Sequence, residues 1–117
     1  MSQLCFVVQT GPYTYQNLDT AYGLAKAALA KGHGVSLFLY IDGVMAANKN
    51  IDAPGERNLA AMLQELAGAG AQIAACGACS KFRGVTEEMY IDGAEMGSLV
   101  DMADMLQEAD VLVNLGF

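Results

Sequence analysis

The sequence has few charged and few basic residues, and each shortage excludes a class of protein. Charged residues make up 16% of the chain, against roughly 25% in ordinary globular domains. Six Lys and Arg face thirteen Asp and Glu, which gives a net charge of −7. Because such an acidic surface repels phosphate backbones, we expect no direct nucleic-acid binding. The hydrophobic fraction of 54% excludes intrinsic disorder, which requires low hydrophobicity and high net charge.

Signals for a membrane or for secretion are also lacking. No apolar run reaches the roughly 18 residues that a membrane helix needs. Residues 1–4 carry no basic segment of the kind that opens a signal peptide. Three cysteines are an odd number without the spacing of a disulfide framework, which is typical of a reducing compartment. We therefore expect a cytoplasmic protein without membrane contact.

The length of 117 residues predicts a single domain over residues 1–117. A chain of this size leaves about a third of its unfolded surface exposed after folding. With so few charges to cover that surface, apolar patches remain, and such patches usually mark partner contacts. We therefore expect an oligomer.

Apolar runs and helix-spaced apolar stripes alternate along the chain. The runs predict strands over residues 4–8, 35–41, 72–75 and 110–115, with a fifth short strand within 89–94. A first helix is expected after Asn17, its N-cap, and ends at the turn 32–34. Pro54 is expected in the first turn of a second helix. The pair Ser98 and Asp101 resembles a capping box that opens a third helix.

Apolar side chains at helical spacing give the second and third helices their expected buried faces. In the second helix these are Leu59, Met62, Leu63 and Leu66; in the third they are Leu99, Met102, Ala103 and Leu106.

This alternation predicts the α/β class: a parallel sheet of four to five strands with helices on both faces, a three-layer α/β/α sandwich. The nearly continuous apolar strands agree, because strands covered on both faces are apolar throughout. In open sheets of this kind, ligands bind outside the carboxyl ends of the strands. Segments 10–17, 42–50 and 76–83 should therefore converge at one edge, where any chemistry is expected.

The segment Cys76-Gly77-Ala78-Cys79 is the strongest functional signal. It directly follows the third strand, so the Cys79 side chain can reach the active edge. A helical turn that starts at Ser80 would favour a thiolate at Cys79 through its free N–H groups. Lys81 and Arg83 lie close in sequence, and nearby cations also lower the pKa of a thiol. These features predict a nucleophilic Cys79 with a lowered pKa.

Other interpretations of the cysteines remain open. The pair Cys76 and Cys79 is the pattern of a redox dithiol, or half of a zinc site. A zinc site would need Cys5, His33 or a second subunit for its remaining ligands, so we expect no metal. Cys76 is equally well explained as a buried strand-end residue. Cys5 lies inside an apolar strand and is expected to be a packing residue.

Two further segments at the active edge offer binding residues. Thr10 and Gly11 begin a loop whose hydroxyl and aromatic groups suit a pocket wall, although an ordinary capped loop explains it as well. Asp42 and Gly43 follow the second strand, where Asp-Gly is also a routine turn pair. His33 falls in a turn at the opposite edge and is expected to be a poor general base for Cys79.

Taken together, these motifs resemble the DsrE/TusD-like sulfur-relay family over nearly the whole chain. The resemblance rests on residues 32–35 leading into 38–44, on 76–79 with 83–85, and on 92–94 with Gly97. It implies a parallel α/β sandwich that assembles into homo-oligomers, as trimers or hexamers, or into hetero-oligomers with sister subunits. The family cysteine corresponds to Cys79, and Cys76 is an addition to the core pattern.

The same resemblance implies a function without a cofactor or metal. Cys79 would accept sulfane sulfur from a donor protein as a persulfide and pass it to the thiol of an acceptor protein, by steps that resemble thiol–disulfide exchange. Lys81 or Arg83 would stabilise the anionic persulfide. Attack by Cys76 on the loaded sulfur would instead leave a disulfide.

Two other functions are also consistent with the sequence. The chain could be a non-catalytic binding or scaffold subunit whose cysteines are packing residues. It could also be a dithiol oxidoreductase that uses Cys76 and Cys79.

Overall fold

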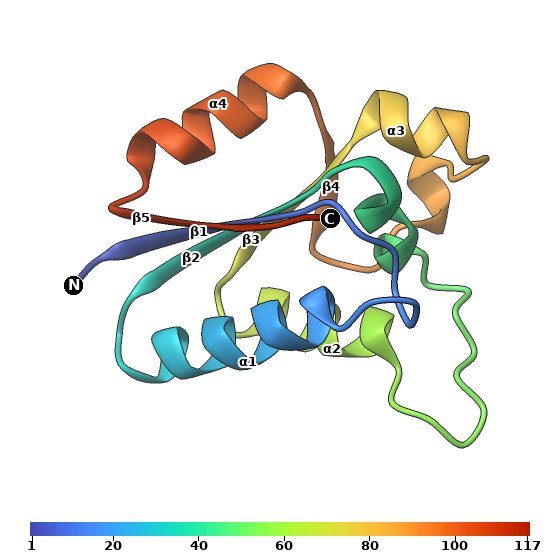
Figure 1. Ribbon diagram of the computed structural model, residues 1–117, viewed down its shortest axis with the longest axis horizontal. Coiled ribbons are helices and arrows are strands. Elements are labelled where there is room, and N and C mark those ends of the chain that lie inside the picture. The colour runs from blue at the N-terminus through green and yellow to red at the C-terminus, as the bar shows by residue number, and fades with distance from the viewer.

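The computed structural model describes all residues, 1–117, as alternating strands and helices around one sheet (Figure 1). The strands are β1 (Gln3–Val8), β2 (Gly34–Leu39), β3 (Gln72–Cys76), β4 (Ala94–Gly97) and β5 (Val111–Leu115). The α-helices are α1 (Asn17–Ala30), α2 (Leu59–Gly68), α3 (Gly77–Phe82) and α4 (Leu99–Glu108). Two 3₁₀ helices, η1 (Ile41–Ala47) and η2 (Glu87–Met89), complete the chain.

The sheet is parallel throughout, with the strand order β4-β3-β2-β1-β5. Helices α1 and α2 cover one face, and α3 and α4 lie on the other (Figure 1). The predicted α/β sandwich with a parallel sheet is therefore confirmed, with five strands. Because all strands run the same way, their carboxyl ends share one edge, and α3 follows β3 directly at that edge.

The core lies mainly between the central strands and the α1–α2 layer. Its largest fully buried side chains come mainly from β1, β2, β3, α1, α2 and η1, and include Phe6, Phe38, Leu18, Leu63 and Val44. Burial of an aliphatic or aromatic side chain contributes about 1.5–3 kcal/mol, so these contacts carry much of the stability. Cys5 is fully buried in β1, as expected for a packing residue.

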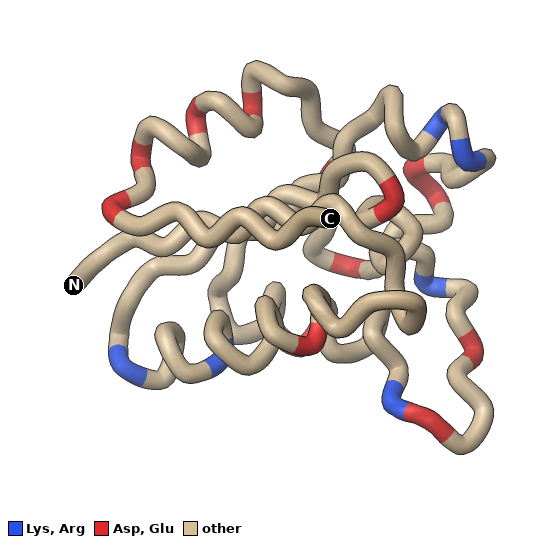
Figure 2. Tube along the Cα trace, in the orientation of Figure 1, with Lys and Arg blue, Asp and Glu red and all other residues tan.

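The opposite face is thinly covered. Helix α4 buries only Met105, and the predicted stripe residues Leu99 and Ala103 are exposed. Strand β5 is an edge strand on which Val111 and Leu112 are about half exposed, at 47% and 51%. The predicted buried stripe of α4 is therefore wrong for Leu99 and Ala103, whereas Met102 and Leu106 are partly buried and pack against the core. Acidic residues lie at intervals along α4, which has no Lys or Arg (Figure 2).

Several predicted boundaries also differ from the structure. Strand β2 ends at Leu39, because the chain turns into η1 at Ile41. Pro54 lies in a loop, and α2 begins only at Leu59, where the Asn58 side chain caps the helix by accepting from Ala61 N–H. The fourth strand in the chain, β4, lies at Ala94–Gly97 rather than within 89–94.

Of the two predicted N-caps at α1 and α4, the first is wrong and the second is confirmed. Asn17 is the first residue of α1 and not its cap; its amide donates to Thr10 Oγ1 and to the carbonyl of Gly116. At α4 the predicted capping box is confirmed: Ser98 accepts from Asp101 N–H, and the Asp101 carboxylate accepts from Ser98 N–H.

Candidate functional site

A pocket of about 700 Å³ opens at the carboxyl edge of the sheet, between α3 and the start of α4. Both Cys76 and Cys79 line it. Its walls come from the end of β2, from α3 and from the turn between β4 and α4, and include Tyr40, Phe82, Met96, Leu99 and Asp101. The predicted location of the site at the strand ends thus coincides with a cavity that holds a thiol pair.

The Cys79 sulfur receives a hydrogen bond from a strained backbone position. The Ile41 N–H donates to Cys79 Sγ at an N···S distance of 3.3 Å. Ile41 has φ +55°, which a β-branched residue adopts only at a cost of about 1–3 kcal/mol. Strain of this kind persists where surrounding contacts enforce it, and here it directs a backbone donor at the sulfur. A donor in this position stabilises negative charge on Cys79 or on a sulfur atom attached to it.

An ion pair between Arg83 and Asp42 joins α3, which carries Cys79, to η1, which carries Ile41. Arg83 donates from Nε to Asp42 Oδ1 at 2.7 Å and from Nη1 to the Cys79 carbonyl at 3.0 Å. Asp42 follows Ile41 in η1, and Arg83 caps the end of α3. The pair therefore links η1, which holds the N–H donor, to the helix that holds the thiol.

The pKa of the Cys79 thiol is raised, contrary to the sequence-based prediction. Burial of the thiol is the main cause, and the hydrogen bond with Cys76 adds to it. The Ile41 N–H and the charge of Arg83 act in the opposite direction without overcoming these effects. The helix also begins at Gly77 rather than at Ser80, so Cys79 lies inside the first turn instead of ahead of it.

Cys76 has a more enclosed place than Cys79. It is the last residue of β3 and the N-cap of α3, and its exposed fraction is 5%. Ser80 Oγ donates to the Cys76 carbonyl at 2.9 Å, and the Tyr90 hydroxyl forms a hydrogen bond with Ser80 Oγ. Because Ser80 uses its single proton on the carbonyl, Tyr90 is the donor to Ser80. This buried chain of hydrogen bonds fixes the backbone at Cys76.

The other predicted binding residues fall into two groups. Lys81 lines the pocket, as expected. Thr10 and Gly43 are buried and do not line it. Thr10 Oγ1 accepts from the Asn17 amide. A Cβ on Gly43 would lie 2.3 Å from the Val8 carbonyl oxygen, so this glycine permits close packing.

Gly11 also lies outside the pocket, against Asp42, whose Cβ would be 3.6 Å from a Cβ on Gly11. The three predicted segments therefore do meet near one edge. Of these three segments only 76–83 supplies pocket walls, and the remaining walls come from Tyr40 after β2 and from the β4–α4 turn.

The residues Tyr40, Ile41 and Met96 were missed in the sequence. Tyr40 and Ile41 belong to the junction after β2, which the apolar pattern extended to residue 41. Recognition that the strand ends at Leu39 would have placed both at the active edge. The positive φ of Ile41 has no sequence signal, because β-branched residues rarely adopt it.

No three His, Cys, Asp or Glu side chains stand close enough together to hold a metal ion. His33 lies at the opposite edge, where its Nδ1 accepts from the Ser2 N–H. Cys5 lies next to Ser36 in the core, where burial raises the pKa of its thiol. Neither residue joins the thiol pair, so this chain alone does not complete a zinc site around Cys76 and Cys79.

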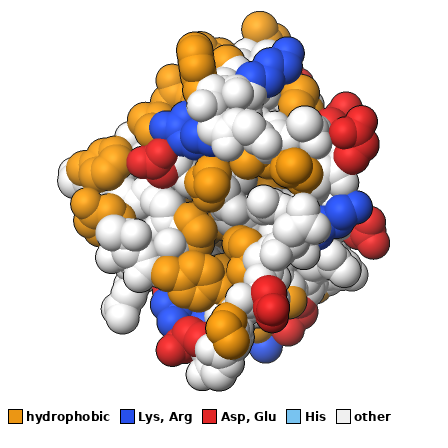
Figure 3. Space-filling view, turned by 90° about the vertical axis from the view of Figure 1, so that its right-hand side faces the viewer, with side chains coloured by type: hydrophobic (Ala, Val, Ile, Leu, Met, Phe, Trp, Pro, Cys, Tyr) orange, Lys and Arg blue, Asp and Glu red, His pale blue; other side chains and the backbone are white.

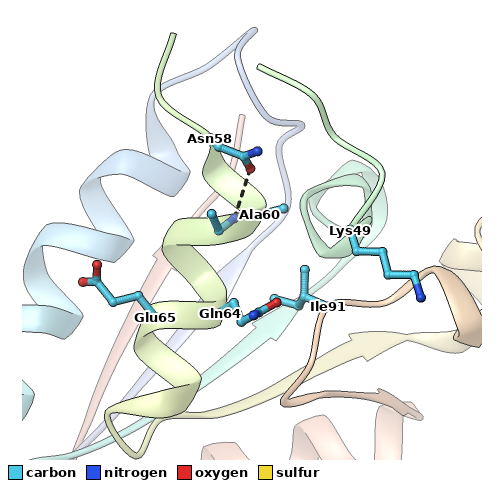
Figure 4. A pocket seen from close by; sticks show the side chains of 7 residues that line it. Lys49, Asn58, Ala60, Gln64, Glu65 and Ile91 are labelled. Carbon is cyan, nitrogen blue, oxygen red and sulfur yellow. Dashed lines mark hydrogen bonds between the residues drawn. The ribbon is translucent and has the colours of Figure 1, made fainter. Parts of the chain in front are cut away.

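A second pocket, of about 370 Å³, lies on the α2 side of the molecule (Figure 4). Lys49, Gln64, Glu65 and Ile91 are among its walls, and Asn58 lies at the start of the helix beside it. Its lining contains no cysteine or histidine. Of these two pockets, only the thiol pocket is lined by cysteine.

Exposed apolar side chains surround the thiol pocket. Phe82 on α3 is 87% exposed, and Val100 and Leu99 at the start of α4 are 69% and 53% exposed. The view onto this end of the molecule shows hydrophobic side chains spread between basic and acidic groups (Figure 3). An apolar surface around a reactive group is typical of a place where another protein docks.

Comparison with known proteins agrees with the fold and identifies the family. The sequence model of the DsrE/DsrF-like family matches residues 2–115. Sulfurtransferase TusD of Serratia proteamaculans is 39% identical over 121 residues, which cover 99% of this chain and 88% of that protein. A Methanopyrus kandleri protein is 34% identical over 107 residues, which cover 92% of this chain and 88% of that one.

Among solved structures, the crystal structure of YchN from Escherichia coli superposes with a TM-score of 0.87 at 26% identity, covering 98% of this chain and 100% of that one. No helix here is long and apolar enough to cross a membrane. The match over almost the whole sequence, together with the shared fold, shows that this chain belongs to the DsrE/DsrF-like family.

Proposed function

We propose that this protein is a cytoplasmic sulfur-relay protein that accepts sulfane sulfur as a persulfide on Cys79 and passes it to a partner protein's thiol. The observation that carries the proposal is the Ile41 N–H donated to Cys79 Sγ within an accessible pocket. Family membership and a relative named sulfurtransferase point in the same direction.

Loading begins when the Cys79 sulfur attacks the outer sulfur of a donor persulfide. The Cys79–donor-sulfur bond forms, and the donor thiolate leaves. Thiolate is the nucleophile in exchange of this kind, and the raised pKa keeps Cys79 mostly protonated at neutral pH. The departing donor thiolate can take the proton of Cys79, so that the donor leaves as a thiol.

The loaded site then holds an extra sulfur atom that carries negative charge. The Ile41 N–H is already directed at this region, and Arg83, which donates to the Cys79 carbonyl, contributes positive charge. Lys81 lines the pocket and is exposed. These groups favour the anionic persulfide over a neutral one. An acceptor thiolate completes the relay by attacking the terminal sulfur, and Cys79 leaves as the thiolate.

Exchange of sulfur between proteins requires that both partners reach the pocket. The exposed side chains Phe82, Leu99 and Val100 offer the apolar contact for donor and acceptor proteins. We propose that the remaining apolar surface, including Val111 and Leu112 on β5, is covered in a homo-oligomer, as a trimer or hexamer, or by sister subunits. Light scattering at micromolar concentration tests this assembly, and a monomer would contradict it.

The loading step is tested by intact-mass spectrometry after exposure of the reduced protein to glutathione persulfide. Measured immediately after a brief exposure, wild type and the core control Cys5→Ala should each gain about 32 Da, the mass of one sulfur atom. Cys79→Ser should not gain it. Equal loading of Cys79→Ser and wild type would overturn the assignment of Cys79. Absence of loading in all three proteins, with thiols confirmed reduced, would favour the non-catalytic binding subunit.

A further inference from the structure

The proposed relay does not use Cys76, although this thiol lies in the same pocket as Cys79. Cys76 occupies the N-cap of α3, and Cys79 is the third residue of that helix. The N-cap side chain of a helix normally points toward the backbone of the third helical residue. Here the Cys76 side chain makes no capping hydrogen bond, so its thiol remains free at the start of the helix that carries Cys79.

The exposure of the two thiols differs in a way that suggests different roles. Cys79 is partly exposed, whereas Cys76 is 5% exposed. A donor protein therefore reaches Cys79 more readily than Cys76. Once Cys79 carries a sulfur atom, the nearest unmodified thiol in the pocket is Cys76, whose backbone is held by the Ser80 hydrogen bond.

We propose that Cys76 is a resolving thiol that releases the sulfur of the Cys79 persulfide as hydrosulfide when no acceptor protein takes it. This inference rests on the proposed loading of Cys79. The sulfur of Cys76 attacks Cys79 Sγ, the inner sulfur of the persulfide, and a Cys76–Cys79 disulfide forms. The bond between Cys79 Sγ and the terminal sulfur breaks.

The reaction balances without another reagent. The thiol of Cys76 and the anionic persulfide of Cys79 give the disulfide and one hydrosulfide ion, which carries away the proton of Cys76. The sulfane sulfur gains two electrons and becomes sulfide, and the two cysteine sulfurs are oxidised to the disulfide. A dithiol reductant then restores both thiols by exchange, and it becomes a disulfide itself.

The pocket suits this reaction because its products need little room. Hydrosulfide is small and leaves through the open pocket of about 700 Å³ that both cysteines line. The third cysteine, Cys5, is fully buried in β1 and is not part of the pocket lining, so it does not compete. Loaded sulfur would thus have two fates, transfer to an acceptor thiol or reductive release.

The test follows a single loading event without reductant. Wild type, Cys76→Ser and Cys5→Ala are exposed briefly to glutathione persulfide and freed of excess reagent. Hydrosulfide and intact mass are then measured over time. Wild type and Cys5→Ala should lose the added mass of about 32 Da, release one hydrosulfide per loaded chain, and end about 2 Da below the reduced protein. Cys76→Ser should keep its sulfur at least about tenfold longer.

Two results would overturn the inference. One is a wild-type persulfide as long-lived as that of Cys76→Ser, and the other is release of hydrosulfide without formation of a Cys76–Cys79 disulfide. Both leave the loading of Cys79 intact, whereas failure of the proposed function would show as absence of loading. Because Cys76→Ser changes a buried residue at the start of α3, titration of wild type with dithiothreitol provides a second measurement. A Cys76–Cys79 disulfide that does not form at any ratio of oxidised to reduced reagent would also contradict the inference.

Discussion

Replacement of Arg83 by Met removes the cation that binds the Cys79 carbonyl and keeps most of the side-chain length. Two contacts are lost: the ion pair with Asp42 and the hydrogen bond to the Cys79 carbonyl. The hydrogen bond from the partly exposed, charged guanidinium to this carbonyl contributes about 1 kcal/mol to stability. The ion pair is partly solvated, since the side chains of Arg83 and Asp42 are 25% and 49% exposed, so it adds at most about 1 kcal/mol.

The free energy of unfolding should therefore fall by about 1–2 kcal/mol. For a domain of this size, that loss lowers Tm by about 4–8 °C. The charge of Arg83 also lowers the pKa of Cys79. Its removal should therefore raise that pKa further and slow alkylation of Cys79 by iodoacetamide at neutral pH, where less thiolate remains.

The assay combines thermal unfolding with the pH profile of alkylation, read by peptide mass spectrometry, for Arg83→Met, Asp42→Asn and the double variant. A coupling energy of about 0.5 kcal/mol or more between Arg83 and Asp42 is expected for residues in direct contact. Lys81→Met is the matched control, because it removes a cation from the same helix without breaking an ion pair or hydrogen bond. Additive stability effects, together with an unchanged alkylation profile for Arg83→Met, would refute the role assigned to the ion pair.

Three further predictions concern the site and its scaffold. Because the pKa of Cys79 is raised, its alkylation should increase with pH to a midpoint above that of free cysteine; a lower midpoint would contradict this. Gly43→Ala should reduce the free energy of unfolding by about 1–3 kcal/mol, because its Cβ would lie 2.3 Å from the Val8 carbonyl oxygen. Urea unfolding measures this loss, and a free energy equal to that of wild type would contradict the close packing of η1 against β1. Ser98→Ala should cost about 1 kcal/mol by loss of the α4 cap, whereas Ser98→Asp should retain most of the stability in the same experiment.

The alternation of strands and helices could be predicted because each element has a signal within its own short segment of sequence. The runs at β1, β2 and β3 are apolar since both faces of these strands are covered. The capping box at Ser98 was recognised because its partners are three residues apart. Strand β4 was misplaced because its sequence, with Glu95 and Gly97, contains no apolar run. Its place in the sheet comes from pairing with β3.

The candidate site was only partly visible in the sequence. The pair Cys76 and Cys79 was found from its position after a strand, and the pocket does lie there. The direction of the pKa shift at Cys79 was wrong because burial depends on how α3 and η1 pack together. In the sequence, Lys81 and Arg83 are both within four residues of Cys79. The fold shows that Arg83 binds Asp42 and the Cys79 carbonyl.

The central claim is that Cys79, rather than Cys76, receives the sulfur. The most direct test is tandem mass spectrometry of wild-type protein that is exposed for seconds to glutathione persulfide and then blocked with iodoacetamide. The account predicts that the first alkylated persulfide appears on Cys79 and that Cys76 carries only the alkyl group. An initial persulfide on Cys76, with Cys79 unmodified by sulfur, would contradict the account and transfer the acceptor role to the buried thiol.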